Sequence, residues 1–400
     1  MTNIDRKQHD KYMLWAIFSL AFCGSVLHGA RVWLLCIIAT LTAKAVDVLA
    51  SMILKTDYDP TDHSSEVSAL IFMLMLPVNI PIYVVVVTVA ITIAVGKHMF
   101  GGKDVYPFNL AALAMCCAAV NWPDKVFSAV VPFAKVDLFS GYTAKATISN
   151  ASLIKDGGVP PYDFVDMVLG NYPGVMGADF VLVIVVIAFF LIIRKKITWH
   201  IPLTFLVTCA AIAYAFPRIV GFSRFESIAF EMLNGYVFFV ALFMLSDPAT
   251  TPKTPKAKII YGFMTAVLAM IFRYFGSFDI GTCFALLLMN TVDSYIERKV
   301  SGEKIKISDI TAVEVTDGEK PAKPVRKLYT APKPTKAEKA EAKKAAKVRR
   351  EKVKGPSDAM NLISEAEDNI DKVIYSTRQI NIDEILKAEA EMNKKKGGKK

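Results

Sequence analysis

The chain is short of charge. Charged residues make up 21% of its 400 residues, while apolar residues make up 54% and the mean hydropathy is +0.39. Charged residues are concentrated in the last quarter of the chain, where residues 297–400 carry 26 Lys and Arg and 18 Asp and Glu. The first three quarters are therefore the part that is poor in charge. This distribution excludes collagen-like and wholly disordered proteins. It predicts a multi-spanning membrane protein with a basic tail on one side.

The spacing of the cysteines indicates neither a disulfide framework nor a metal site. The six cysteines lie inside apolar runs and none has the CxxC spacing of a zinc or redox site. A free thiol in such a run behaves as a small hydrophobe, which excludes a disulfide scaffold. Adjacent Cys116 and Cys117 leave two interpretations open, a helix- or lipid-facing pair or ligation of a cluster shared with a partner protein.

Two further features are missing. No signal-peptide cleavage site follows the first apolar run. The basic tail has its lysines interleaved with acids and lacks an aromatic platform, so we expect no nucleic-acid partner. The terminal KKKGGKK is instead suited to anionic lipid headgroups.

What the chain has is apolar segments. A membrane span needs about 20 apolar residues, and fewer when other helices enclose it. We expect an all-α integral membrane protein with about ten transmembrane helices. The ten segments are 13–28, 32–54, 67–77, 80–96, 109–121, 178–193, 200–217, 228–246, 258–274 and 279–296. The third and fifth are short, so we expect them to be tilted, broken or enclosed by the others.

Charge asymmetry orients these segments. The even count puts both termini on one side, and the short loops rich in Lys and Arg, such as Arg194–Lys196, share that side. The positive-inside rule therefore predicts cytoplasmic termini and an external loop. The expected regions are a cytoplasmic N-terminus (1–12), a first membrane repeat (13–121), the external loop (122–177), a second repeat (178–296) and a charged cytoplasmic tail, partly helical or disordered (297–400).

The two membrane regions resemble each other. LMLPVNIPIY from Leu74 is echoed by FMLSDPATTP from Phe243, and Phe100-Gly101-Gly102 matches Phe275-Gly276-Ser277 at an offset of 175 residues. Since each half has five helices, an odd number, the second half must be inverted relative to the first. Inverted repeats place shared sites near the midplane, on interrupted helices. The proline-broken stretches of the two echoed motifs stand at corresponding places.

Six motifs occur in order along residues 13–300: GKHMFGG, PFNLAALAM, LGNYPGVMG, WHIPLTFL, FMLSDPATTP and RYFGSFDIGTCFALLLMN. In this set the chain resembles the NqrB/RnfD family of membrane proteins, which contains the D subunit of the Rnf ion-translocating electron transport complex. The sister members are the B subunits of the Na⁺-translocating NADH:quinone oxidoreductase. A short N-terminus favours the Rnf side, while the long tail matches nothing in this resemblance.

The resemblance implies a covalent cofactor in the external loop. Family members carry FMN through a threonine phosphoester, attached by a separate flavin transferase at a motif of roughly Asp-x-x-Ser/Thr-x-Ala-Thr. Asp137, Ser140 and Thr143 fall on this spacing, although Tyr142 stands where the family has Ala. Thr147 follows Ala146 but loses the spacing from the aspartate. Thr143 is the first candidate and Thr147 the second; a threonine without any role is the alternative for each.

Other residues are candidates for a second flavin, riboflavin or FMN, or for an ion route. Lys97 lies beside Gly101 and Gly102, which permit close backbone approach, although a simple cytoplasmic turn explains them as well. Asp247 ends an apolar run, where a carboxylate is costly unless it is paired or functional. Asp47 and Glu231 are intramembrane carboxylates for which hydrogen bonding to a neighbouring helix is the alternative. No metal site is expected.

Two functions remain open. The resemblance implies a flavoprotein subunit of the cytoplasmic (inner) membrane, not catalytic alone, in a complex that couples ferredoxin:NAD⁺ electron transfer to Na⁺ or H⁺ translocation. Its partners would be other membrane subunits, cytoplasmic iron–sulfur and flavin subunits and an external flavoprotein subunit. The alternative is a ten-helix channel or transporter for a small polar solute, which would have no need for the threonine loop.

Overall fold

The computed structural model describes residues 3–301 except 57, 103–105, 142, 144–145, 149–152, 155–157, 160, 220 and 277–279. These residues belong to one compact unit, 1–312, of the two into which the chain divides. The tail for which helical or disordered structure was expected lies outside the described residues beyond Ser301.

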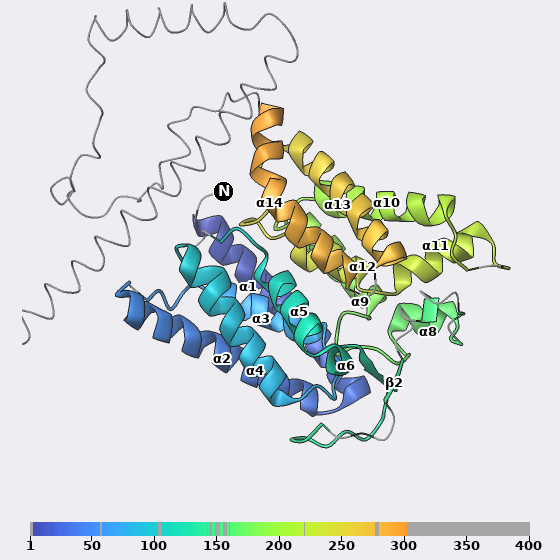
Figure 1. The fold of residues 1–400 in the computed structure, drawn as a ribbon, viewed down its shortest axis with the longest axis horizontal. Helices are drawn as coiled ribbons and strands as arrows, with labels where there is room; N and C mark the ends of the chain where they lie inside the picture. The colour runs from blue at the N-terminus through green and yellow to red at the C-terminus, as the bar shows by residue number, and fades with distance from the viewer. Residues whose placement is uncertain are drawn as a thin grey trace, which may run out of the picture. The chain divides into compact units, whose positions relative to one another are not determined.

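The first group of helices fills the blue-to-teal part of Figure 1. It consists of α1 (Asn3–His28), α2 (Arg31–Leu54), α3 (Ser64–Leu74), α4 (Ile82–Ile91) with its π-helical turn η1 (Thr92–Lys97) and 3₁₀ turn η2 (His98–Phe100), and α5 (Leu110–Asn121). Helix α2 packs against α1, α3 and α4, and α3 packs against α5. The side chain of Asn109 caps α5 by accepting a hydrogen bond from the Ala112 N–H at 3.0 Å.

The connecting segment contains the short helices α6 (Pro123–Val126) and α8 (Phe164–Leu169) and two strands, β1 (Ser128–Val130) and β2 (Ala146–Ile148). The strands are antiparallel, with Ala129 opposite Thr147. This ladder departs from the expected all-α architecture. β-branched Val130, Thr147 and Ile148 favour extended backbone, and pairing satisfies backbone groups that no helix accommodates.

The second group, green to orange in Figure 1, consists of α9 (Val181–Ile193), α10 (His200–Ala215), α11 (Arg224–Leu233), α12 (Val237–Phe239), the π-helical turn η3 (Val240–Met244), α13 (Pro255–Phe275) and α14 (Gly281–Ser301). Helix α13 packs against both α10 and α14. Gly262 makes the first contact possible, because a Cβ there would lie 2.2 Å from the Thr204 hydroxyl oxygen. The groups meet where α5 packs on α14 and α1 on α9.

Each of the ten expected segments overlaps a helix of the structure. Among the described residues, four helices are long and apolar enough to cross a membrane: Lys7–His28, Arg31–Leu54, Ile82–Phe100 and Pro255–Phe275. Arg224–Leu233 and Val237–Met244 form a fifth candidate span if taken together, bent by 64°. Four further apolar helices, including α3 and α5, are shorter. The chain is therefore a helical membrane protein with four to five candidate spans plus shorter apolar helices.

The two short segments, expected to be tilted, broken or enclosed, are largely enclosed. Nine of the eleven residues of α3 and eight of the twelve residues of α5 are buried. Helix α3 ends before Pro77, which leaves carbonyl groups without helical partners. The Leu74 carbonyl accepts from the Gly177 and Ala178 N–H groups, and the Leu76 carbonyl accepts from that of Met176. A distant segment thus supplies hydrogen-bond donors for the carbonyl groups left unpaired at the break, as an apolar environment requires.

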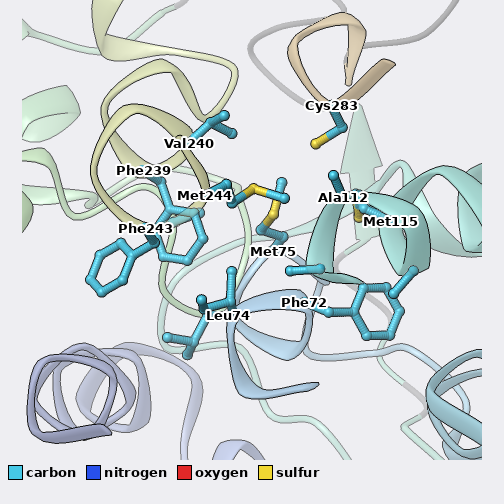
Figure 2. Close-up of a cluster of buried hydrophobic side chains, with 14 of the residues drawn as sticks. Phe72, Leu74, Met75, Ala112, Met115, Phe239, Val240, Phe243, Met244 and Cys283 are labelled. Carbon is cyan, nitrogen blue, oxygen red and sulfur yellow. The ribbon is translucent and has the colours of Figure 1, made fainter. Parts of the chain in front are cut away.

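The corresponding residues Met75 and Met244, one in each group, are both fully buried. Figure 2 shows their side chains in one apolar centre, with Leu74, Phe239 and Phe243 around them. The same cluster includes Cys283 of α14 and Met115 of α5. All six cysteines are free thiols, and four of them are buried, as expected of small hydrophobes.

Candidate functional site

The loop residues that match the modification motif form a turn. Asp137 Oδ1 accepts hydrogen bonds from the N–H groups of Phe139 at 3.0 Å and Ser140 at 2.9 Å. The Gly141 N–H donates to the Asp137 carbonyl at 3.1 Å. The bonds from the backbone N–H groups of Ser140 and Phe139 hold the pKa of Asp137 below its usual value. Asp137 and Ser140 are exposed, so the turn is available to a partner protein.

The two candidate threonines follow this turn in different environments. Thr143 is half-buried and comes two residues after Gly141. Thr147 is exposed and sits in β2, paired with Ala129 of β1. Tyr142, the departure from the motif, lies outside the described residues. Thr143 lies closer to the turn made by Asp137 and Ser140, whereas Thr147 offers the more exposed side chain.

Lys97 belongs to a buried polar cluster, together with Asp47, Asp62, Ser65 and His98. The π-helical turn η1 places its ammonium 2.9 Å from Asp62 Oδ2 and 2.7 Å from the Ser65 hydroxyl. His98 Nε2 is 2.7 Å from Asp47 Oδ1, which also accepts from the Ser65 hydroxyl.

Burial raises the pKa of Asp62, but the Lys97 ammonium and the Ser64 N–H outweigh burial and lower it overall. Asp47, Asp62, Lys97 and His98 of this cluster line a pocket of about 350 Å³ together with Gly101 and Gly102. The structure therefore brings four sequence candidates, Asp47, Lys97 and the two glycines, together.

Asp247 lies elsewhere, three residues after the end of η3. Its Oδ1 accepts from the Ala249 N–H at 3.0 Å, and its Oδ2 lies 3.4 Å from the Asn109 side-chain amide. The same amide donates to the Met244 carbonyl at 3.1 Å, so Asn109 joins the start of α5 to the break after η3. A nearby cavity of about 610 Å³ is lined by Phe100, Tyr106, Pro107, Phe108, Ala249, Asn290, Thr291, Asp293 and Ser294. Its aromatic rings suit a planar ligand.

Glu231 is paired with two arginines. Arg218 binds it through both Nε, at 2.6 Å, and Nη2, at 2.8 Å, while Arg273 Nε lies 2.8 Å away. The carboxylate is buried, as is Arg273. Pairing with neighbouring elements, left open by the sequence, is thus what the structure shows for Glu231, and Asp47 is bonded to Ser65 and His98 in the same manner.

Sequence reasoning missed three of these residues. Asn109 joins α5 to the break after η3, Arg31 bonds to the Val78 carbonyl 47 residues away, and Arg273 pairs with Glu231 across 42 residues. A signal was available for each. An arginine or asparagine bordering an apolar run is costly unless its polar atoms find partners.

The chain resembles known proteins over most of its length. The model of the NQR2, RnfD, RnfE family matches residues 2–306. A similar relative is the D subunit of the Na(+)-translocating ferredoxin:NAD(+) oxidoreductase complex of Acetobacterium woodii, 28% identical over 282 residues, or 70% of this chain and 84% of the relative. The D subunit of the proton-translocating ferredoxin:NAD(+) oxidoreductase complex of Clostridium ljungdahlii is 28% identical over 247 residues, covering 60% and 73%. The D subunit of the ion-translocating oxidoreductase complex of Haemophilus influenzae is 26% identical over 345 residues, covering 74% and 94%.

Proposed function

Since the chain belongs to the NQR2, RnfD, RnfE family, we propose that it is the D subunit of an Rnf-type complex. In this role it is the membrane flavoprotein component of an oxidoreductase that transfers electrons between ferredoxin and NAD⁺ and moves Na⁺ or H⁺. The match over residues 2–306 carries the proposal. Three relatives, each named as the D subunit of an ion-translocating oxidoreductase complex, support it, and two of them are named for ferredoxin:NAD(+). One of these relatives is named for Na⁺ and another for protons.

The proposed cofactor is FMN bonded to Thr143 through its phosphate, with Thr147 as the second candidate. The fit rests on the turn, which presents exposed Ser140 and Asp137 directly before the threonine. A flavin exchanges electrons singly or in pairs, so it supplies the redox chemistry and the protein supplies position. The role of the chain's own residues is to hold the loop that bears it.

A second flavin, riboflavin or FMN, is proposed for the aromatic cavity beside Asp247. Its rings, from Phe100, Tyr106 and Phe108, would stack on an isoalloxazine. Asp247 and Asn109 supply a carboxylate and an amide at the adjoining break. Lys97, Gly101 and Gly102 line the separate 350 Å³ pocket, so we propose them as neighbours of another component of the complex or of a cofactor rather than as part of this cavity.

We propose ten spans in two inverted repeats, with the termini cytoplasmic and the 122–177 loop outside the cytoplasmic membrane. A repeated charge arrangement supports this. Asp62 and Glu231 are 169 residues apart, the same offset as Leu74 and Phe243. Asp62 precedes α3, Glu231 precedes α12 and η3, and each pairs with a basic residue at or near the end of a later helix, Lys97 or Arg273. Inversion would put these two ion clusters near opposite membrane faces.

Partners follow from the relay that is proposed. One protein with one or two flavins cannot connect a soluble donor to a soluble acceptor. We therefore propose association with other membrane subunits, with cytoplasmic iron–sulfur and flavin subunits, and with an external flavoprotein subunit, after modification by a flavin transferase. The alternative function, a channel or transporter for a small polar solute, shares the repeats but has no need for a modified threonine.

The deciding experiment is the intact mass of the chain purified after co-expression with a flavin transferase. We expect one added flavin mononucleotide residue, with fluorescence retained in a denaturing gel. An unmodified mass would remove the covalent flavin while leaving the family membership intact, and solute uptake by proteoliposomes would then test the channel alternative.

A further inference from the structure

A buried guanidinium ties together two distant parts of the chain. Arg31, the first residue of α2, is 2% exposed. Its four hydrogen bonds to backbone carbonyls reach segments about 50 and about 105 residues further along the chain. An arginine beside apolar helices is retained only where its donors are satisfied, which marks it as a residue with a specific task.

The first segment is the break between α3 and α4. Arg31 Nε donates to the Val78 carbonyl at 2.7 Å, and Nη2 donates to the Ile80 carbonyl at 2.8 Å. The prolines on either side keep this stretch out of a helix, so its carbonyls have no partners four residues further along. The guanidinium takes the place of the missing helical N–H groups.

The second segment is the turn that precedes the candidate threonines. Arg31 Nη1 donates to the Asp137 carbonyl at 3.0 Å and to the Leu138 carbonyl at 2.5 Å. Gly141, at the other end of the turn, lies against the same group: its φ is +72°, and a Cβ there would be 2.5 Å from Arg31 Nη2 and 2.9 Å from the Asn79 carbonyl oxygen. Both ends of the turn are therefore fitted to the guanidinium.

We propose that Arg31 is the positioning residue of the cofactor-bearing loop: it fixes the turn 137–141 on the break between α3 and α4, so that the group carried by Thr143 keeps a constant place relative to that break. This inference rests on the proposed attachment of flavin to the loop. It adds a link between the external loop and the interrupted helix at which inverted repeats place their shared sites.

The geometry requires arginine rather than any cation. The guanidinium offers five donors in a rigid planar fork, and here three nitrogens point at four carbonyls on two segments. A lysine ammonium has three donors on one atom and cannot span both segments. Another positively charged side chain therefore cannot replace Arg31 in holding both segments.

The test uses the full chain in detergent, co-expressed with a flavin transferase, in four forms: wild type, Arg31→Gln, Arg31→Lys and Lys135→Gln. Lys135 is an exposed cation of the same loop, so its substitution changes the charge equally and serves as the matched control. Two quantities are measured: hydrogen exchange of the backbone amides of 139–141, and the fluorescence anisotropy of the attached flavin. In-gel fluorescence reports separately whether flavin is attached at all.

We expect both Arg31 variants to exchange these amides at least tenfold faster than wild type and to show a lower flavin anisotropy, with the control unchanged. Wild-type exchange in Arg31→Gln, or full restoration by Arg31→Lys, overturns the proposal. If the wild type carries no flavin, the proposed cofactor fails, and the exchange data still decide whether Arg31 fixes the turn.

If Arg31→Gln does not yield folded protein, Gly141→Ala gives the same answer from the loop side. It leaves Arg31 intact and pushes a methyl group into the guanidinium. Faster exchange and lower anisotropy are expected again, and wild-type behaviour of this variant contradicts the proposal.

Discussion

At the scale of single residues, the Asp137 carboxylate is engaged by its own turn. It accepts hydrogen bonds from the N–H groups of Phe139 and Ser140 and so shapes the segment that a flavin transferase would encounter. The motif is therefore a small folded feature as well as a spacing of residue types. Thr143 lies shortly after it, and Thr147 lies within the following strand β2.

We expect Thr143→Val to abolish covalent flavin and Thr147→Val to leave most of it, because only Thr143 lies at the motif's spacing from Asp137 and Ser140. Tyr142→Ala should raise the modified fraction, since a bulky side chain beside the reacting hydroxyl hinders alignment. In-gel fluorescence measures the fraction of chain that carries flavin, and the mass of the peptide containing residues 136–155 locates the attachment. Loss of flavin in Thr147→Val alone would move the site by four residues.

Asp62 should make stability depend on pH. Its pKa in the folded chain is lowered by Lys97 and the Ser64 N–H against the opposing effect of burial. A depressed pKa means that the ionised group stabilises the fold above the unfolded value of about 3.9, and that this contribution is lost as pH falls through the folded pKa.

We expect Asp62→Asn to lower Tm between about pH 5 and about pH 7, and the gap from wild type to narrow below about pH 4. Asp124→Asn, at an exposed position, is the control and should follow the wild type throughout. Thermal unfolding in detergent followed by tryptophan fluorescence measures this. A gap that stays constant down to about pH 3, roughly one unit below the ordinary value, would show that Asp62 does not carry the effect.

At the scale of elements, breaks in helices are joined by groups from other elements. Helix α3 is completed by N–H groups of 176–178, and the end of η3 is held by Asn109 at the start of α5. Asn109 does two things at once, since its Oδ1 caps α5 and its Nδ2 reaches the Met244 carbonyl. These two contributions can be separated by substitution.

We expect Asn109→Ala to lose both contributions and Asn109→Ser to lose only the amide contacts with Met244 and Asp247, because a serine hydroxyl still caps a helix. The cap contributes about 1 kcal/mol and the second hydrogen bond roughly 0.5–1.5 kcal/mol. The order of Tm should therefore be wild type, Ser, Ala. Equal values for Ser and Ala would show that the cap contributes nothing here.

At the scale of the whole molecule, the proposed orientation decides which surfaces meet which partners. Lys135 lies in the connecting segment and Lys195 in the loop between α9 and α10, and both are exposed. The positive-inside rule puts the first outside and the second inside. This is the premise on which access of a flavin transferase depends.

A cysteine at Lys135 should react with a membrane-impermeant maleimide in intact cells, and one at Lys195 only after permeabilisation. The unaltered chain measures the background from half-buried Cys23 and Cys117. The opposite pattern would invert the topology and remove the loop from the side on which the transferase is proposed to act.

The positions of the helices and of their interruptions follow from local patterns in the sequence. Runs of apolar residues indicate helices because backbone groups in an apolar setting must be satisfied locally, and prolines stop a helix wherever they occur. For this reason ten segments, the interruptions near Pro77 and Asp247, and the family resemblance could be read from the chain alone. The strands β1 and β2 could not, since three-residue pairings have almost no local signal.

Which polar groups hydrogen-bond to the backbone at those interruptions depends on how the helices pack. Arg31 reaches carbonyls 47 and 106 residues away, Lys97 finds Asp62 across 35 residues, and Asn109 finds Met244 across 135. Each partner is fixed by how helices pack, and a local pattern contains no record of packing. The sequence specified that polar atoms beside apolar segments need partners; the fold alone selected the partners, and with them the residues that hold the proposed cofactor loop in place.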